Sequence, residues 1–191
     1  EASLAVVKFF RAPALPAFSS QGMASVIAQQ SYHRALAMLH GSRFQLILGS
    51  HSYDKSGTLL PTFVAGQAYD RTLRSRVWNL EEKKTDVNIA MAIYRDVAKA
   101  HCDQVVLCSN DSDAEPVLSA VREDFPGIRV GVVTPVRPPD KDIAPGRRVS
   151  TSLSRHAHWT RSYLRDEELA RAQLPIRIPT RKRPILKPAH W

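Results

Sequence analysis

Short apolar runs alternate with stretches of helical periodicity along the whole chain, and this alternation restricts the fold more than any other feature. Runs rich in β-branched or aromatic residues lie at 4–10, 44–49, 104–108 and 129–134. The run at 104–108, QVVLC, lacks polar alternation, which is typical of a strand covered on both faces of a parallel sheet. The pattern predicts an α/β domain with a mostly parallel sheet.

Helices are expected between these strands, because apolar residues recur there at helical spacing. The expected helices cover 24–40, 114–124 and 165–173, and another begins at Thr85 or Asp86. A short strand is expected at 156–160. The buried face of the helix that begins near Asp86 is expected to hold Val87, Ala90, Met91, Tyr94 and Val97.

The chain of 191 residues has the length of one ordinary domain, which we expect to cover residues 1–175. From 50 to 80 the pattern dissolves into polar, Gly- and Thr-rich sequence, which indicates an arm or loop with little core of its own. The proline-rich residues 135–146 predict a further loop. Residues 176–191 are rich in Lys and Arg and indicate a basic C-terminal tail.

Several protein classes are excluded by composition. No apolar run approaches the length of about 18 to 20 residues that a membrane-spanning helix needs. The two cysteines, Cys102 and Cys108, are too few for a disulfide scaffold; we expect them to be small buried apolar groups in a protein of the reducing cytoplasm. The chain starts with Glu1 rather than Met, so we expect that its beginning is missing.

The formal net charge of +9 favours a polyanionic partner, and nucleic acid is the commonest one. The locally acidic stretch 101–150 lies between two basic flanks, as expected if carboxylates hold metal ions while Lys and Arg contact phosphates. An ordinary solvated surface explains the same distribution. The cations expected to contact an RNA backbone are Arg71, Arg74, Arg76, Arg181, Lys182 and Arg183.

The segment SNDSD at 109–113 follows the most apolar strand and precedes a helix. Its carboxylates, Asp111 and Asp113, are therefore expected at the carboxyl edge of the sheet, where open α/β sheets bind their ligands. Two acids separated by one residue can both reach one divalent cation. The alternative is structural: Asp113 caps the following helix and Asp111 forms the turn.

A second acidic segment, EEKKTDVN at 81–88, places Asp86 at the opening of the preceding helix, where it can face the same sheet edge. Lys83 and Lys84 are then candidates for contact with phosphates, or they are solvated beside a helix cap. No glycine-rich phosphate loop of the GxGxxG or GxxxxGK type occurs, which weakens the case for a nucleotide-cofactor enzyme.

Five segments of the chain carry a further signal: KKTDVNIAMAIYRD, VVLCSNDSDAEPVLSAVREDFPG, RVGVVTP, LARAQLP and KPAHW. Together they resemble the bacterial branch of the NYN domain family of PIN-like ribonucleases. The resemblance implies a Rossmann-like three-layer α/β/α sandwich and a metal-dependent endoribonuclease that hydrolyses RNA with Mg²⁺ or Mn²⁺. It assigns the catalytic, metal-binding acids to Asp86, Asp111 and Asp113. Substrate-positioning roles fall to Asn88, Ser109, Asn110, Lys83 and Lys84, with Asn110 in place of the family's usual glycine.

One family feature is absent. Members normally open with a strand that ends in an Asp-Gly-Phe-Asn type motif, which supplies another metal-binding Asp and the central strand of the sheet. Nothing similar precedes Leu4. If the chain begins at Glu1, we expect a gap at the centre of the sheet, filled by another chain or a homo-oligomer partner, or a protein that is not a nuclease.

Two other functions stay open at this point. The chain could be a non-catalytic RNA-binding or partner-binding module that keeps the PIN-like fold, or a small-molecule phosphatase or nucleotide-binding domain that uses the same acidic pair. His156 and His158 alternate on an expected strand, but they lack an adjacent third ligand, so we interpret them as structural or exposed. Trp159 and Trp191 are candidates for stacking on bases, although packing against the core is the simpler role.

Overall fold

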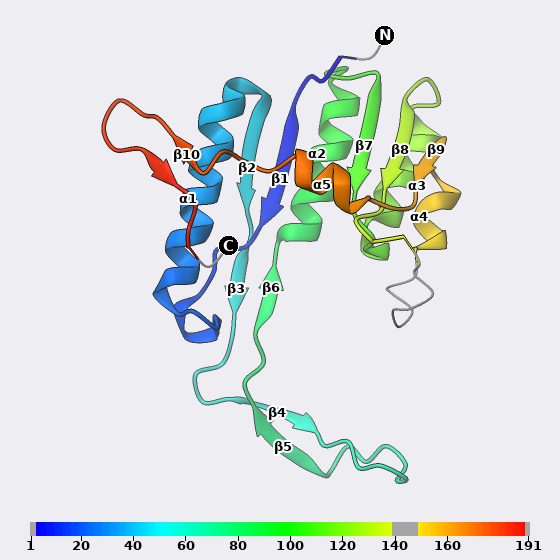
Figure 1. Ribbon diagram of the computed structural model, residues 1–191. Coiled ribbons are helices and arrows are strands. Elements are labelled where there is room, and N and C mark those ends of the chain that lie inside the picture. Colours follow the sequence, from blue (N-terminus) through cyan, green and yellow to red (C-terminus); the bar gives the residue numbers. More distant parts are fainter. Residues whose placement is uncertain (1–2, 139–148, 190–191) are drawn as a thin grey trace.

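A computed structural model describes residues 3–138 and 149–189. Five strands form two parallel groups, in which β1 pairs with β2 and β8 lies between β7 and β9. Their bounds are β1 Val7–Arg11, β2 Phe44–Leu48, β7 Gln104–Cys108, β8 Arg129–Val133 and β9 Trp159–Arg161. The arrows of β1, β2, β7 and β8 point the same way in Figure 1. The prediction of an α/β fold with parallel strands is confirmed at this level.

Helices separate the parallel strands along the chain (Figure 1). Their bounds are α1 Met23–His40, α2 Thr85–Ala98, α3 Glu115–Asp124, α4 Thr151–Arg155 and α5 Asp166–Arg171. Short 3₁₀ turns cover η1 Pro16–Phe18, η2 Gly41–Arg43 and η3 Ser112–Ala114. The strand expected at 156–160 is β9, which begins later, at Trp159. The helix α4 before it was not expected, because five residues are too few to show helical periodicity.

The main core lies between α2, α3, α4 and the group β7–β8. Leu118, Val121, Val130 and Leu153 are almost completely buried there, and Ile93 of α2 packs against them. The prediction for α2 was partly wrong, because Val87 is 66% exposed and Met91 is 53% exposed. Ala90, Tyr94 and Val97 face this core as predicted, and Ile89 and Ile93 lie there in place of Val87 and Met91.

The two parallel groups are not joined by strand pairing in the described residues, so β1 and β7 each end their group with an unpaired edge. Helix α2 connects them: it contacts β1 and also contributes to the main core. The Lys8 Nζ atom of β1 lies 2.7 Å from Asp96 Oδ1 of α2. Val106, in the middle of β7, is 47% exposed, although parallel strands are normally covered on both faces.

Residues 50–83 form an arm that projects away from the parallel strands (Figure 1). It contains two antiparallel pairs: β3 (Ser50–Ser52) with β6 (Glu81–Lys83), and β4 (Thr58–Pro61) with β5 (Arg74–Val77). All four residues of β5 are exposed. This part of the chain, expected at 50–80 as an arm or loop, thus contains strands rather than loop alone.

The C-terminal segment packs against α1 through a short hairpin of β10 (Arg177–Ile178) and β11 (Ile185–Leu186). Ile178 and Ile185 are buried with Ala35 of α1 in a second, smaller core. The segment predicted as a basic tail thus contributes apolar packing, and its cations lie around the hairpin. The predicted loop at 135–146 falls mostly outside the described residues.

Candidate functional site

The turn after β7 carries two of the three expected acids. The Ser109 Oγ atom accepts a hydrogen bond from the Asp111 backbone N–H at 3.0 Å, and Asp111 Oδ1 accepts one from the Asp113 N–H at 3.2 Å. Asp111 is thus the N-cap of η3, whereas the structural alternative expected Asp113 to cap the following helix; α3 has Ala114 at its N-cap and no side-chain cap. Both carboxylates remain exposed at the carboxyl end of β7, where they can also meet a ligand.

Asp86 lies in the first turn of α2, which begins close to the end of β2. A Cβ atom at Gly49 would approach the Thr85 hydroxyl and lie 2.8 Å from the Lys83 carbonyl oxygen, so only glycine fits this contact. Lys84 has a left-handed φ of 74° at the N-cap, and the Thr85 hydroxyl donates to Glu82. This turn brings Asp86 to the same edge of the fold as the residues after β7.

The three acids act on one another electrostatically. The pKa of Asp86 is raised above its ordinary value, first by partial burial and then by the negative charges of Asp111, Asp113 and Glu82. Asp86 therefore holds a proton more readily than an ordinary aspartate. We use the name acidic edge for Asp86, Asp111 and Asp113.

The side chains predicted to position a substrate lie around the acidic edge with partners of their own. Asn110 Oδ1 accepts a hydrogen bond from the Ser150 N–H at 2.8 Å, which fixes the start of α4. Asn88 Nδ2 is 3.5 Å from the Leu48 carbonyl oxygen, at the limit of a hydrogen bond. Lys83 pairs with Glu81, whereas the exposed Lys84 has no such bond among the described residues. Their roles toward a substrate stay predictions.

The cations predicted to contact RNA lie in two segments. Arg71, Arg74 and Arg76 belong to the arm, where the Arg76 guanidinium donates to the Ser56 and Gly57 carbonyl oxygens. Arg181, Lys182 and Arg183 lie between β10 and β11. RNA binding by these groups stays a prediction.

Other candidate residues have structural partners. His158 Nδ1 accepts a hydrogen bond from the Val130 N–H at 2.9 Å, and His156 Nε2 lies 3.3 Å from Glu115 Oε1. Trp159 packs over Gly131 in the neighbouring strand, which favours its expected structural role. Cys108 is exposed, so the expectation that it is buried was wrong. The described residues contain no group of three or more His, Cys, Asp or Glu side chains arranged to hold a metal ion.

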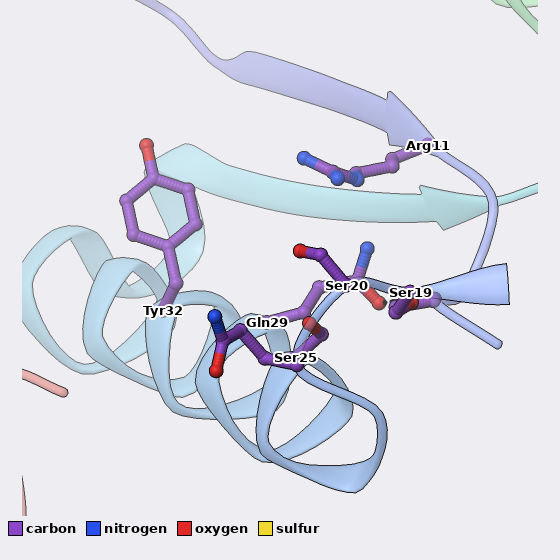
Figure 2. A pocket seen from close by; sticks show the side chains of 8 residues that line it. Arg11, Ser19, Ser20, Ser25, Gln29 and Tyr32 are labelled. Atoms are coloured by element: carbon purple, nitrogen blue, oxygen red, sulfur yellow. Dashed lines mark hydrogen bonds between the residues drawn. The ribbon is translucent and has the colours of Figure 1, made fainter. Parts of the chain in front are cut away.

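Sequence reasoning missed a polar pocket of about 440 Å³ between the end of β1 and the start of α1 (Figure 2). It is lined by Arg11, Ala14, Ser19, Ser20, Gln21, Ser25, Gln29 and Tyr32. The signal that could have revealed it is Arg11, directly after the expected strand at 4–10, followed further along the chain by the hydroxyl groups of Ser19, Ser20 and Ser25.

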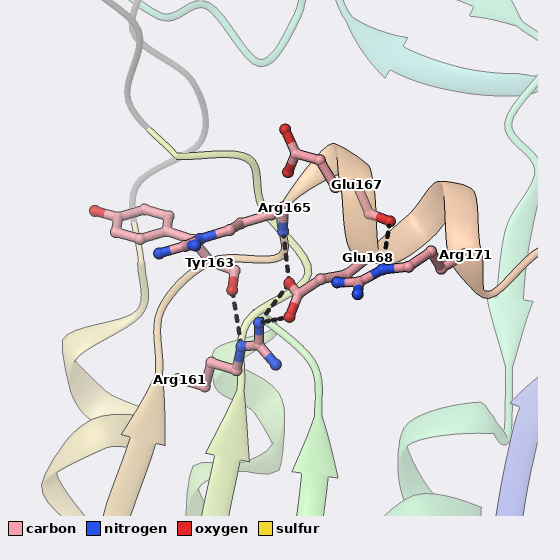
Figure 3. A network of polar contacts seen from close by, with 6 residues as sticks. All are labelled: Arg161, Tyr163, Arg165, Glu167, Glu168 and Arg171. Atoms are coloured by element: carbon pink, nitrogen blue, oxygen red, sulfur yellow. Dashed lines mark hydrogen bonds and ion pairs between the residues drawn. The ribbon is translucent and has the colours of Figure 1, made fainter.

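A charged network closes the carboxyl end of β9 (Figure 3). The Arg161 guanidinium donates to Glu168 and to the Tyr163 carbonyl oxygen, while the Arg165 N–H donates to Glu168 at 3.0 Å. These contacts lower the pKa of Glu168 to about 2, chiefly through the Arg161 hydrogen bond. The network fixes the start of α5 after β9.

Comparison with known proteins relates the chain to an oxidoreductase. It is 34% identical over 186 residues to 6-hydroxy-3-succinoylpyridine 3-monooxygenase HspA of Pseudomonas putida (strain DSM 28022 / S16). The alignment covers 97% of this chain and 57% of that protein, so the chain spans a little over half of the relative's length. No family model and no solved structure matches the chain.

This relative overturns the expected chemistry. The prediction of a metal-dependent endoribonuclease, and with it the hydrolase and nuclease classes, was wrong, because the related protein is named as a monooxygenase. Mg²⁺ or Mn²⁺ as cofactor was wrong on the same ground, and the described side chains offer no metal-binding group. The acidic motifs misled because two acids spaced by one residue serve a helix cap as well as a metal site. Among the described residues, no helix has the length and apolar character needed to cross a membrane.

Proposed function

We propose that this chain is part of an enzyme, an oxidoreductase that acts as a monooxygenase on a hydroxylated nitrogen heterocycle. The similarity to 6-hydroxy-3-succinoylpyridine 3-monooxygenase carries this proposal, because it extends over 97% of the chain and includes the acidic edge. In such a reaction dioxygen and two electrons from a reductant such as NADH place one oxygen atom in the substrate and one in water. The hydroxyl group of a hydroxypyridine must lose or gain a proton along the way.

The acidic edge is the candidate for that proton transfer. The pKa of Asp86 is raised by burial and by Asp111 and Asp113, which brings the carboxyl closer to the working range of a general acid or base. In this proposal Asp86 exchanges the proton of the substrate hydroxyl, and Asp111 and Asp113 act through their charge on Asp86. Asn88 and Ser109 are the neighbouring groups proposed to orient the ring.

The test uses the natural polypeptide that contains this chain, with 6-hydroxy-3-succinoylpyridine, NADH, added flavin and ¹⁸O₂. We expect NADH oxidation that depends on the substrate, and one ¹⁸O atom in the pyridine product. Asp86→Asn should lower kcat about 100-fold, the size of a general acid–base contribution, whereas the exposed Asp103→Asn should leave it unchanged. NADH oxidation without labelled product, or equal rates in both variants, would count against the proposal.

We also propose that the parallel strands belong to one larger sheet. The parallel groups β1–β2 and β7–β9, with helices between them, fit the three-layer PIN-like sandwich that the NYN resemblance implies, with one strand absent between β1 and β7. The unpaired edges and the exposed Val106 support a further strand at this place, supplied by more of the same polypeptide or by a second chain. The greater length of the related monooxygenase leaves room for the first source.

A further inference from the structure

The polar pocket at the end of β1 is a cavity with a single charge. Its volume of about 440 Å³ lies in the range of small-molecule sites. Among the described residues, Arg11 is the one charged residue that lines it. Figure 2 shows the guanidinium at the end of β1, across from Ser20 and above α1. The pocket therefore combines a cation with hydroxyl groups and excludes carboxylates from its wall.

The charge of Arg11 is not compensated within the described residues, where the guanidinium has no ion pair or hydrogen bond. The first turn of α1, which borders the pocket, also contains no acidic residue. The positive charge of Arg11 also acts on His33 of α1, whose pKa is lowered by burial and additionally by Arg11. An anion in the pocket would satisfy a positive charge that the fold leaves free.

The hydroxyl groups in the pocket divide into fixed and free ones. Ser19 Oγ donates to the Leu15 carbonyl oxygen at 2.7 Å, and the buried Gln29 is held by Ala12 and Ala14. These contacts shape the wall. The hydroxyls of Ser20 and Ser25 make no hydrogen bond in the described residues, so both can donate to a ligand.

We propose that this pocket binds the carboxylate of a small organic acid, with Arg11 as its bidentate partner and Ser20 and Ser25 as further donors. A planar carboxylate matches the two parallel N–H groups of a guanidinium. Its single charge also matches the single cation, whereas a phosphate dianion would leave one charge unpaired. The aromatic ring of Tyr32, which packs edge-on against Phe9, gives the organic part an apolar wall. The inference does not rest on the proposed function, since it concerns binding alone.

The experiment is an NMR titration of the 191-residue chain with 4-oxopentanoate, its uncharged methyl ester and inorganic phosphate. We expect saturable shifts at Ser20 and Ser25 with 4-oxopentanoate only. Arg11→Gln should weaken binding at least about tenfold, the value of a charge-assisted hydrogen bond, and Arg11→Lys should weaken it less. Arg34 is an exposed arginine of α1 that does not line the pocket, so Arg34→Gln removes the same charge as a control and should bind like the parent chain.

Three results would overturn the proposal: no saturable binding of 4-oxopentanoate, binding that survives Arg11→Gln, or tighter binding of phosphate. Arg11 is exposed, so Arg11→Gln is expected to keep the fold, which the dispersion of the same spectra checks. Because the titration needs no turnover, its outcome is separate from that of the monooxygenase assay.

Discussion

Asp86 holds a proton more readily than an ordinary aspartate because burial and the charges of Asp111, Asp113 and Glu82 oppose its ionisation. The native state therefore binds more protons than the unfolded state at and above about pH 4, and the folded protein loses stability as the pH rises through that window. Above the native pKa of Asp86 the loss is complete. We expect Asp111→Asn to lower the pKa of Asp86 and to reduce this loss.

The same substitution keeps the shape of the turn, because an asparagine oxygen can still accept the Asp113 N–H. At pH 7 the gain in the free energy of unfolding should be small, about 0.2 to 1 kcal/mol, since these carboxylates are exposed and screened by solvent. Carbon-detected NMR of the side-chain carboxyls gives the pKa, and urea unfolding at pH 4 and pH 7 gives the stability. Asp103→Asn serves as the control; an equal change in that variant would contradict the electrostatic explanation.

At the scale of secondary structure elements, the pairing of β8 with β9 depends on a missing side chain. Gly131 pairs with Trp159 in the strand register, and the indole ring occupies the space that a Cβ atom would need. Gly131→Ala should therefore lower the free energy of unfolding by about 1 to 3 kcal/mol through overpacking. Gly127→Ala, which meets no atom within 4 Å, is the matched control and should change stability by less than about 0.5 kcal/mol. Urea denaturation of both variants measures the difference, and equal stabilities would refute this packing role.

Which elements the sequence could predict follows from how periodic each one is. The run at Gln104–Cys108 matched its strand because its four consecutive apolar residues, bounded by polar ones, are too few for a buried helix. In α2 the apolar residues lie on more than one face of the helix, so their spacing alone does not identify the buried face. Ile89 and Ile93 face the core, whereas Val87 and Met91 are exposed. The rule for strand ends concerns only Asp111 and Asp113, which follow β7, because Asp86 lies at the start of α2. The pocket beside Arg11 depends on the path of the chain between β1 and α1, which no local pattern encodes.

The molecule as a whole consists of two parallel groups that share α2. The larger core covers β7 and β8, whereas β1 and β2 rely on α1 and on contacts with α2. Both candidate sites lie at carboxyl ends of strands, the acidic edge after β7 and the polar pocket after β1. The relative positions of these two sites thus depend on the contacts that α2 makes with both groups.

The Lys8–Asp96 ion pair is the polar part of that connection, and its removal should loosen one group from the other. The side chains are only 19% and 20% exposed, so Asp96→Asn leaves a mostly buried ammonium group without its counter-charge. We expect the free energy of unfolding to fall by about 1 to 3 kcal/mol, with part of it regained in Lys8→Met/Asp96→Leu, where both charges are absent. Asp166→Asn removes an exposed ion pair with Arg137 and should lower the free energy of unfolding by less than about 0.5 kcal/mol.

Hydrogen exchange measured by mass spectrometry tests whether the ion pair holds one group to the other. In Asp96→Asn we expect faster exchange in β1 and β2, while β7 and β8 keep their protection. Uniform acceleration would instead mean that the two groups unfold as one unit.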